Sequence, residues 1–353
     1  MGRHERALLK LFEGTVIPAT PLALTAERKL DEKRQRLLNR YYLTAGAGGL
    51  AAAVHTTQFA IRKPEINLFE PVLQIASEEA EAYERQTGEV IVKIAGACGR
   101  TKQAVKEAET ALKYGYDAVL LSPGGLSDFT EEELLSRTKA VAEIIPVVGF
   151  YLQPSVGGRV FSFDYWKALC EIEKVVAIKS APFNRYQTLD VVRAAALSQR
   201  ADQIALYTGN DDNIIIDLLT KYRFTDCGKV YEKRFVGGLL GHWSVWTHTA
   251  VKLFEKIKTA AAKDVIPTEL LTLAAEVTDA NAAFFDTAHQ FKGCIAGLHE
   301  VLRRQGLLEG IWCLDENETL SPGQTEEIDR IYRMYPHLND DGFIAANIKD
   351  WKA

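Results

Sequence analysis

Two short stretches, residues 147–154 and 175–182, each a mostly apolar run that ends in a proline, constrain the fold more than any other feature of the sequence. Short apolar runs bounded by chain breakers are typical of strands that are buried on both faces. Tyr151 stands near the end of the first run and Lys179 near the end of the second. Burial disfavours the ammonium form of a lysine, so its pKa falls and a free amine can attack a carbonyl. The simpler interpretation is a lysine that extends from a strand end into water.

The two runs belong to a regular alternation of strands and helices. We expect eight buried strands and seven intervening helices with short connections, among them a strand at 203–209, a helix at 213–222 and a strand at 235–240. This alternation predicts an α/β protein built as a closed (β/α)8 TIM barrel. A doubly wound open sheet is the alternative, but it requires a glycine-rich phosphate turn after an early strand, and no such turn is found.

The strands end near Ser244, and the remaining chain is predicted to be helical. We expect helices at 245–262, 268–304 and 323–334. The sequence thus predicts a barrel over residues 1–243, with a short helical lead at its N-terminus. A C-terminal helical region over 244–353 packs on this barrel or serves in assembly.

The overall composition excludes several classes of partner. A net charge of -5 and a pI of about 5.9 give no reason to expect nucleic acid or an anionic membrane surface. Five scattered cysteines without a Cys-x-x-Cys pair are typical of reduced thiols in a cytoplasmic protein. No apolar run approaches the length of a membrane span.

In a TIM barrel the chemistry lies at the C-terminal ends of the strands. Tyr151 and Lys179 fall there, and so do Thr20 after the first strand and the pair Thr56-Thr57 after the second. We therefore expect these hydroxyls, the phenol and the amine to face a common space. His55 precedes the threonine pair and is either an acid-base group or a histidine bonded to a neighbouring strand end.

Gly237 and Gly238 stand within the eighth strand. Glycine in a strand often marks close approach to a ligand, and we count both residues among the candidate substrate-binding positions. A bulge or a bend at a barrel corner explains them equally well.

Several of these residues carry a resemblance to a known family. The chain resembles the dihydrodipicolinate synthase / N-acetylneuraminate lyase superfamily of Schiff-base-forming lyases and synthases from about Gly14 to Gly241. The matching motifs are Pro18-Ala19-Thr20-Pro21, Thr56-Thr57, Tyr151-x-x-Pro154, Ile178-Lys179 and Thr208-Gly209-Asn210-Asp211.

The resemblance implies a role for each matching residue. Lys179 would form an imine with a 2-keto acid such as pyruvate, and Tyr151 would shuttle protons. Thr57 would hold the substrate carboxylate, and Thr56 would join the proton relay. The resemblance also implies no cofactor, no metal and a homo-oligomer, either a dimer or a tetramer.

The chain also departs from the family pattern. The usual Gly-Thr-Thr-Gly-Glu loop is replaced by residues 55–59, His-Thr-Thr-Gln-Phe. The arginine that the synthases carry two residues after the Tyr-x-x-Pro proline is Val156 here, and Gly124-Gly125 replace their tyrosine after strand four. These differences argue against dihydrodipicolinate synthase itself and favour another cleavage, condensation or dehydration of a 2-keto acid.

Two alternatives stay open at this point. A metal-dependent aldolase needs several ligands on one face, and the sequence offers only His55, His242 and the pair Asp211-Asp212. A barrel that has lost catalysis and binds a metabolite as a sensor or structural subunit is the other.

Overall fold

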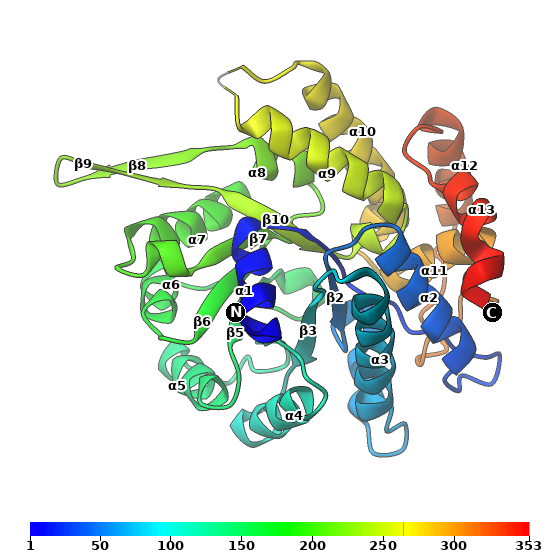
Figure 1. Ribbon diagram of the computed structural model, residues 1–353, viewed down its shortest axis with the longest axis horizontal. Coiled ribbons are helices and arrows are strands. Elements are labelled where there is room, and N and C mark those ends of the chain that lie inside the picture. Colours follow the sequence, from blue (N-terminus) through cyan, green and yellow to red (C-terminus); the bar gives the residue numbers. More distant parts are fainter. Residues whose placement is uncertain (264, 353) are drawn as a thin grey trace.

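The computed structural model describes residues 1–263 and 265–352, and within them eight parallel strands form one sheet that curls into a barrel (Figure 1). Their spatial order is β1-β10-β7-β6-β5-β4-β3-β2. A parallel bridge between Ala19 and Ala51 joins the two ends of this order and closes the barrel. The barrel strands are β1 (Val16–Pro18), β2 (Gly49–Ala52), β3 (Val92–Ala97), β4 (Ala118–Leu121), β5 (Val147–Leu152), β6 (Val175–Ala181), β7 (Ala205–Thr208) and β10 (Phe235–Leu240).

Seven helices follow the strands and cover the outside of the barrel, which confirms the predicted (β/α)8 fold. A capping box precedes the helix Glu131–Ala142, because Glu133 N–H donates to Thr130 Oγ1 and Thr130 N–H donates to the Glu133 carboxylate. The helices are α2 (Glu32–Thr44), α3 (Phe69–Thr87), α4 (Thr101–Lys113), α5 (Glu131–Ala142), α6 (Phe163–Cys170), α7 (Arg185–Leu197) and α8 (Ile214–Leu219).

Strand alternation divides the buried side chains into two cores. On β5, Val148, Phe150 and Leu152 belong to one hydrophobic cluster, whereas Val147 and Tyr151 belong to the other. Successive strand residues point to opposite faces of a sheet. The first cluster fills the barrel interior, and the second lies between the strands and the surrounding helices.

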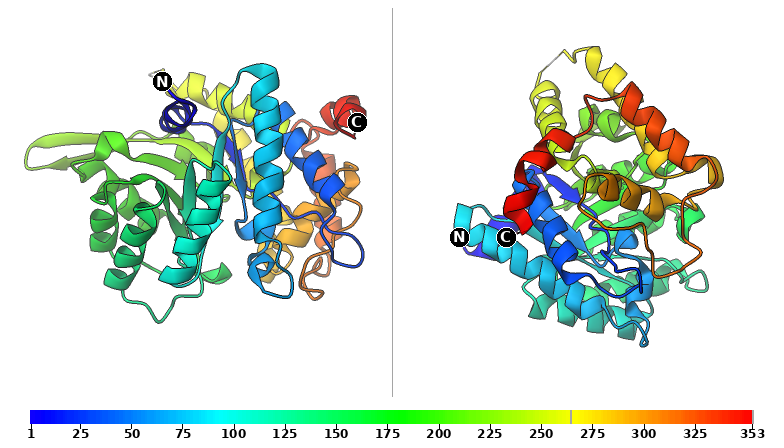
Figure 2. Two further views of the ribbon diagram at one scale, coloured as in Figure 1. Left: turned by 60° about the horizontal axis from the view of Figure 1, so that its bottom comes forward. Right: turned by 90° about the vertical axis from the view of Figure 1, so that its right-hand side faces the viewer.

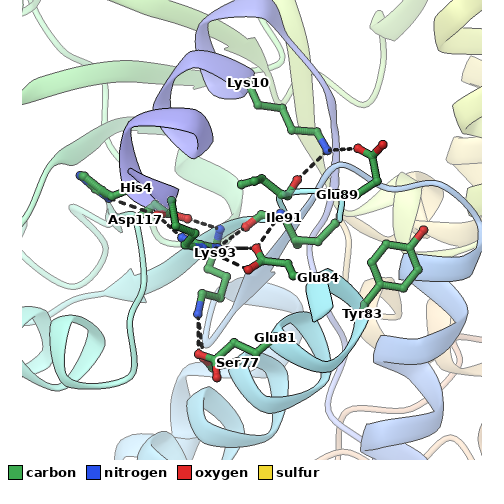
Figure 3. A network of polar contacts seen from close by, with 12 residues as sticks. His4, Lys10, Ser77, Glu81, Tyr83, Glu84, Glu89, Ile91, Lys93 and Asp117 are labelled. Atoms are coloured by element: carbon green, nitrogen blue, oxygen red, sulfur yellow. Dashed lines mark hydrogen bonds and ion pairs between the residues drawn. The ribbon is translucent and has the colours of Figure 1, made fainter. Parts of the chain in front are cut away.

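Helix α1 (Arg3–Glu13) closes the N-terminal end of the barrel, as Figure 1 shows. Leu11 joins the interior cluster, and its carbonyl accepts a hydrogen bond of 2.8 Å from Tyr207 Oη. Polar contacts tie the helix to the strand ends, including a contact of 3.1 Å between His4 Nδ1 and the Asp117 carboxylate (Figure 3).

A hairpin was not expected between α8 and the last barrel strand. The helix predicted over 213–222 ends at Leu219, and β8 (Tyr222–Asp226) and β9 (Lys229–Lys233) form an antiparallel ribbon that projects from the barrel (Figure 1). Cys227 and Gly228 form its turn with φ of 46° and 77°. Two left-handed residues in a two-residue loop match the twist of a hairpin, which is why the chain turns back here.

The C-terminal region consists of helices α9 (Thr247–Ala261), α10 (Glu269–Phe284), α11 (Cys294–Arg304), α12 (Gln324–Met334) and α13 (Asp341–Lys352). The single helix predicted over 268–304 is therefore wrong, since residues 285–293 separate α10 from α11, and α13 was not predicted. Figure 2 (right) shows this region lying along α2, against which α13 packs. One hydrophobic core includes Tyr42, Trp243, Phe284 and Trp351, so it is continuous across the predicted division at 243/244.

No helix in the described part of the chain has the length and apolarity that crossing a membrane requires.

Candidate active site

A cavity of about 60 Å³ lies at the C-terminal ends of the barrel strands. By this measure of volume a water molecule needs roughly 10–15 Å³, so the cavity has room for about four to six waters or a small organic molecule. Its polar lining comes from both the barrel and the C-terminal region: His55, Thr56, Gln153, Lys179, Asp211 and Cys294. Most of the remaining lining is apolar.

Lys179 projects into this cavity from β6. Its register partner on β5 is Phe150, an interior residue, and the amine lies 4.6 Å from the centre of the Phe150 ring. The residue is 9% exposed. Burial lowers the pKa of Lys179 to about 8, and the nearby Asp211 carboxylate only partly opposes this effect.

Gly209 makes room for the lysine. A Cβ atom at this position would lie 2.5 Å from Lys179 Cε and 2.8 Å from Ala181 Cβ. Neither distance is compatible with ordinary van der Waals contact, so a side chain at 209 would displace the lysine stem. The glycine of the Thr-Gly-Asn-Asp motif therefore leaves the space that the Lys179 side chain occupies.

Asp211 is the acidic group of the cavity. One carboxylate oxygen accepts a hydrogen bond of 2.9 Å from the backbone N–H of His242. Burial raises the pKa of Asp211 to about 7, against the opposing effects of that hydrogen bond and of Lys179. From the sequence, Asp211 belongs to the Thr-Gly-Asn-Asp motif and is a candidate metal ligand, but it is not expected beside the lysine. Its position two residues after Gly209, just past the end of a barrel strand, is the sequence feature that could have placed it near the lysine.

A buried network below the cavity holds this loop. Asp217, fully buried on α8, accepts hydrogen bonds from Thr208 Oγ1 at 2.7 Å and from Asn210 Nδ2 at 2.9 Å. The Asn210 side-chain carbonyl in turn accepts from the backbone N–H of Phe183 at 3.1 Å. The loops after β6 and β7 are thereby fixed to each other.

Only one of the predicted threonine hydroxyls lines the cavity. Thr56 does so, and its Oγ1 donates to the Ala19 carbonyl at 2.7 Å. Thr57 and Thr20 are buried, and their hydroxyls donate to backbone carbonyls of Thr20 and Ala51 at 2.7 and 2.9 Å. The structure thus gives these two hydroxyls a role in holding the loop after β2 on β1, and it does not bring them to the cavity.

His55 lines the cavity, as expected of an acid-base candidate. Burial, together with the positive charge of Lys179, lowers the pKa of His55 to about 4. The imidazole is therefore neutral at physiological pH and can offer one N–H donor and one acceptor nitrogen.

Tyr151 is not brought together with Lys179. Its ring stacks on Trp166 at 5.0 Å and meets Phe161 edge-to-face at 5.5 Å, in the core between the barrel and α6. The phenol oxygen accepts a bond of 3.4 Å from the Phe161 N–H. Phe150 and Lys179 share the interior face, so the next residue of β5 must point outward.

Gly237 and Gly238 also lie away from the cavity. A Cβ at 237 would meet the Thr15 carbonyl at 2.5 Å, and one at 238 would meet the Trp243 ring at 2.6 Å. The pairing of β10 with β7 shifts register between Phe235 and Gly237. Close packing at an irregular strand accounts for both glycines, which is the alternative that the sequence left open.

The C-terminal region supplies a wall of the cavity that the sequence did not predict. Phe285 and Phe291, from the segment between α10 and α11, line it together with Cys294, the first residue of α11. No motif marks these residues, so nothing in the sequence pattern could have placed them at the barrel mouth.

A metal site was the rival expectation. Within residues 1–263 and 265–352, no group of three or more His, Cys, Asp and Glu side chains is arranged to hold a metal ion. His242 is occupied elsewhere, with Nδ1 3.3 Å from the Asn281 amide nitrogen.

Comparison with known proteins gives a consistent assignment. Residues 13–221 match the model of the dihydrodipicolinate synthetase family. The sequence is 34% identical over 117 residues to a 4-hydroxy-tetrahydrodipicolinate synthase of Clostridium novyi, and 25% identical over 196 residues to an N-acetylneuraminate lyase of Escherichia coli. These alignments cover 33% and 55% of this chain, and 38% and 61% of the respective relatives, which is less than two thirds of their length.

Solved structures share the fold. Dihydrodipicolinate synthase from Oceanobacillus iheyensis superposes with a TM-score of 0.74 at 16% identity, covering 95% of this chain and 100% of the other. N-acetylneuraminate lyase from Fusobacterium nucleatum, solved in complex with pyruvate, superposes with a TM-score of 0.71 at 17% identity and covers 92% and 98% of the two chains.

Proposed function

The chain belongs to the dihydrodipicolinate synthetase family, whose relatives here are lyases and synthases, and on that premise we propose that it is a Schiff-base-forming lyase or synthase of a small 2-keto acid. Lys179 is the proposed nucleophile. The observation that carries the proposal is the position of Lys179 in a small, mostly apolar cavity that Asp211 also lines.

The lowered pKa gives the amine its reactivity. Because burial lowers the pKa of Lys179, a larger fraction of this amine is unprotonated at neutral pH than of an exposed lysine. The free amine adds to the keto carbon, and loss of water from the carbinolamine leaves the imine. A keto acid of pyruvate size has about six non-hydrogen atoms, which matches the room available in the cavity.

Asp211 is the proposed proton-transfer group of this reaction, in the place that the sequence analysis gave to Tyr151. A group whose pKa lies near the working pH can both donate and accept a proton, and the pKa of Asp211 is about 7. The carbinolamine oxygen leaves as water only after it has received a proton. Asp211 supplies that proton, and it takes one back when the imine is hydrolysed.

The substrate carboxylate needs donors in a cavity that offers no arginine. In the described part of the chain, Lys179 is the single cationic lysine or arginine of the lining. The iminium that forms on Lys179 carries the positive charge next to the carboxylate. Neutral His55 and the amide of Gln153 supply N–H donors. The hydroxyl oxygen of Thr56 stays available as an acceptor.

The reaction differs, in our proposal, from that of dihydrodipicolinate synthase proper. Val156 lines the cavity at the position where the family's synthases carry an arginine for the second substrate's carboxylate. An apolar side chain cannot pair with that charge. A homo-oligomeric state and a cytoplasmic location stay predictions.

Borohydride trapping tests the proposal. Intact protein incubated with pyruvate and sodium borohydride is expected to gain the mass of one reduced pyruvyl group, and peptide mapping should place it on Lys179. The Lys179→Met variant should gain nothing, whereas the Lys93→Met variant, altered at another buried lysine, should be labelled normally.

A chelator should leave the labelling unchanged. If neither pyruvate nor other short 2-keto acids label the wild-type protein, the imine mechanism is wrong and a barrel that only binds metabolites becomes the better reading of the site.

A further inference from the structure

We propose that the carbonyl compound joined to, or released from, the keto acid is a short, apolar and uncharged aldehyde, selected by an aromatic wall that the C-terminal region places over the barrel mouth. The inference rests on the proposed function and names the substrate class of the same site. The wall consists of Phe183, Phe285 and Phe291, with Val156 beside them.

The aromatic wall is assembled from parts of the chain that are distant in sequence. Phe183 follows β6 and Phe291 precedes α11, and their rings meet edge-to-face at 5.8 Å. Phe285 is seated against Gly241 at the end of β10, where an added Cβ would lie 2.7 Å from the ring. The C-terminal region is thus fitted to the barrel rim at two places, and the cavity is bounded on this side by rings.

Two of the wall residues have backbones in the left-handed region. Phe183 has φ of 52° and Phe291 has φ of 66°, which phenylalanine adopts rarely. Such backbones persist only where the surrounding structure fixes them, and they cluster at ligand sites. The surrounding structure therefore fixes the direction of both rings.

A buried carboxylate fixes the segment that carries Phe285 and Phe291. Asp286 accepts hydrogen bonds from the backbone N–H of Gly293 at 2.9 Å and from Ser321 Oγ at 2.5 Å. Its other oxygen lies 2.6 Å from His289 Nδ1. The segment is thereby held at both of its ends and to the chain before α12.

Charge and hydrogen-bonding capacity decide which aldehyde fits. The wall provides no cation, and Asp211 adds an anionic or hydroxyl-like acceptor rather than a positive charge. A second carboxylate or phosphate would lose water without gaining a partner. The hydroxyls of a sugar-like aldehyde would be left unpaired against phenylalanine rings, whereas an alkyl group gains dispersion contacts there.

The chemistry of the step is balanced by groups already named. Asp211 takes a proton from the keto acid's methyl group, which turns the Lys179 imine into an enamine. The terminal carbon of the enamine forms a bond with the aldehyde carbon as the C=O π bond breaks, and Asp211 returns its proton to the aldehyde oxygen, which becomes a hydroxyl. Water then hydrolyses the imine and frees the amine, and cleavage is the same sequence reversed.

Matched aldehydes test the proposal, each offered to the wild-type protein with pyruvate. Isobutyraldehyde and glyoxylate have the same branching, with two methyls in place of two carboxylate oxygens, and 2-methylbutanal and glyceraldehyde differ by methyls in place of hydroxyls. We expect kcat/KM for condensation to favour the apolar member of each pair by about 100-fold. Equal rates, or a preference for glyoxylate or glyceraldehyde, would overturn the proposal.

Substitution of the wall gives a second measurement. Phe291→Ala should raise kcat/KM for benzaldehyde relative to isobutyraldehyde about tenfold, because it opens the wall. Phe343→Ala, in the same C-terminal region but stacked on His248 at 3.9 Å, should leave that ratio unchanged. Phe291→Leu replaces the alanine variant if the latter does not fold. An unchanged ratio in a folded variant contradicts the proposed wall.

The two proposals fail differently. Absence of the borohydride adduct with pyruvate removes the proposed function. A normal adduct combined with a preference for charged or hydroxylated aldehydes keeps that function and removes the aromatic-wall inference alone.

Discussion

Two buried lysines stand on strands of the same barrel, and their surroundings differ at every point. Lys93, at the N-terminal end of β3, is 2% exposed, and its amine donates to Ser77 Oγ at 2.9 Å and to the Glu81 carboxylate at 3.0 Å (Figure 3). Lys179, near the C-terminal end of β6, points into the barrel and faces the ring of Phe150. Hydrogen bonds to its amine are absent among the described residues.

The comparison teaches that pairing, more than burial, separates a structural lysine from a reactive one. An amine that is hydrogen-bonded to both Ser77 and Glu81 between strand and helix is fixed in place and closed to other molecules. An ammonium without hydrogen-bond partners in an apolar cavity loses its proton more readily and remains open to a substrate. The N-terminal end of this barrel holds a lysine bonded within the fold, and we propose that the C-terminal end, where TIM barrels carry their active sites, holds a reactive one.

Replacement of each lysine by methionine should separate their roles, and the largest effect is expected at Lys179. Lys179→Met should reduce turnover by more than about a thousandfold, equivalent to about 4 kcal/mol, because the nucleophile is lost. Its unfolding free energy should be unchanged or higher, since an apolar group replaces a desolvated charge. Steady-state kinetics and urea unfolding check both parts, and a variant that retains a tenth of wild-type activity would contradict the role of Lys179.

Removal of the acid beside Lys179 should have the next largest effect. Asp211→Asn should lower kcat by about 10²- to 10³-fold, because the group that moves protons is gone. The Asp211 charge raises the pKa of Lys179, so its loss should lower that pKa further. The alkaline-rising limb of kcat/KM, expected near pH 8 in the wild type, should therefore move to lower pH.

If the alkaline-rising limb of kcat/KM stays at the same pH in Asp211→Asn, the charge of Asp211 does not affect the pKa of Lys179. A pH–rate profile of both proteins provides the measurement, and the two groups are expected to titrate as a pair.

Lys93→Met should lower stability and leave the chemistry unchanged. Loss of the two hydrogen bonds should lower the unfolding free energy by about 1.5 kcal/mol, a modest figure because the Glu81 side chain is half-exposed and regains water. Labelling by pyruvate and borohydride should stay at the wild-type level. A loss of labelling in folded protein would mean that the two ends of the barrel are not independent.

Tyr151→Phe is expected to have the smallest effect, less than about threefold in kcat, equivalent to under about 0.7 kcal/mol. The phenol makes one long hydrogen bond of 3.4 Å outside the barrel, so its removal leaves the cavity intact. Stopped-flow measurement of imine formation checks this. A loss above a hundredfold would restore the proton-shuttle role that the sequence resemblance implied.

The sequence determined the fold because the pattern of buried runs and amphipathic helices is local information. It also identified Lys179, His55 and Thr56, which line the cavity. Tyr151 was misplaced because the face it occupies depends on register: Phe150 pairs with Lys179, and that pairing is set in three dimensions.

The parts of the structure that the sequence did not predict are those that depend on contacts between segments distant in the chain. The aromatic wall depends on how residues 285–294 meet the barrel rim, and the hairpin depends on a turn at Cys227 and Gly228 that interrupts a helical pattern. Gly237 and Gly238 show the same limit, since the surfaces they approach belong to β1 and to the residues after β10.

The way in which the barrel closes has a consequence for how the chain folds during synthesis. β1 pairs along its length with β10, and on its other side it meets β2 through the bridge from Ala19 to Ala51 and a hydrogen bond from the Gly48 N–H to the Val16 carbonyl. The Ala19 carbonyl also accepts the hydroxyl of Ser244. Some 220 residues must therefore leave the ribosome before the first strand gains its main neighbour, so the first strand made is the last to be secured.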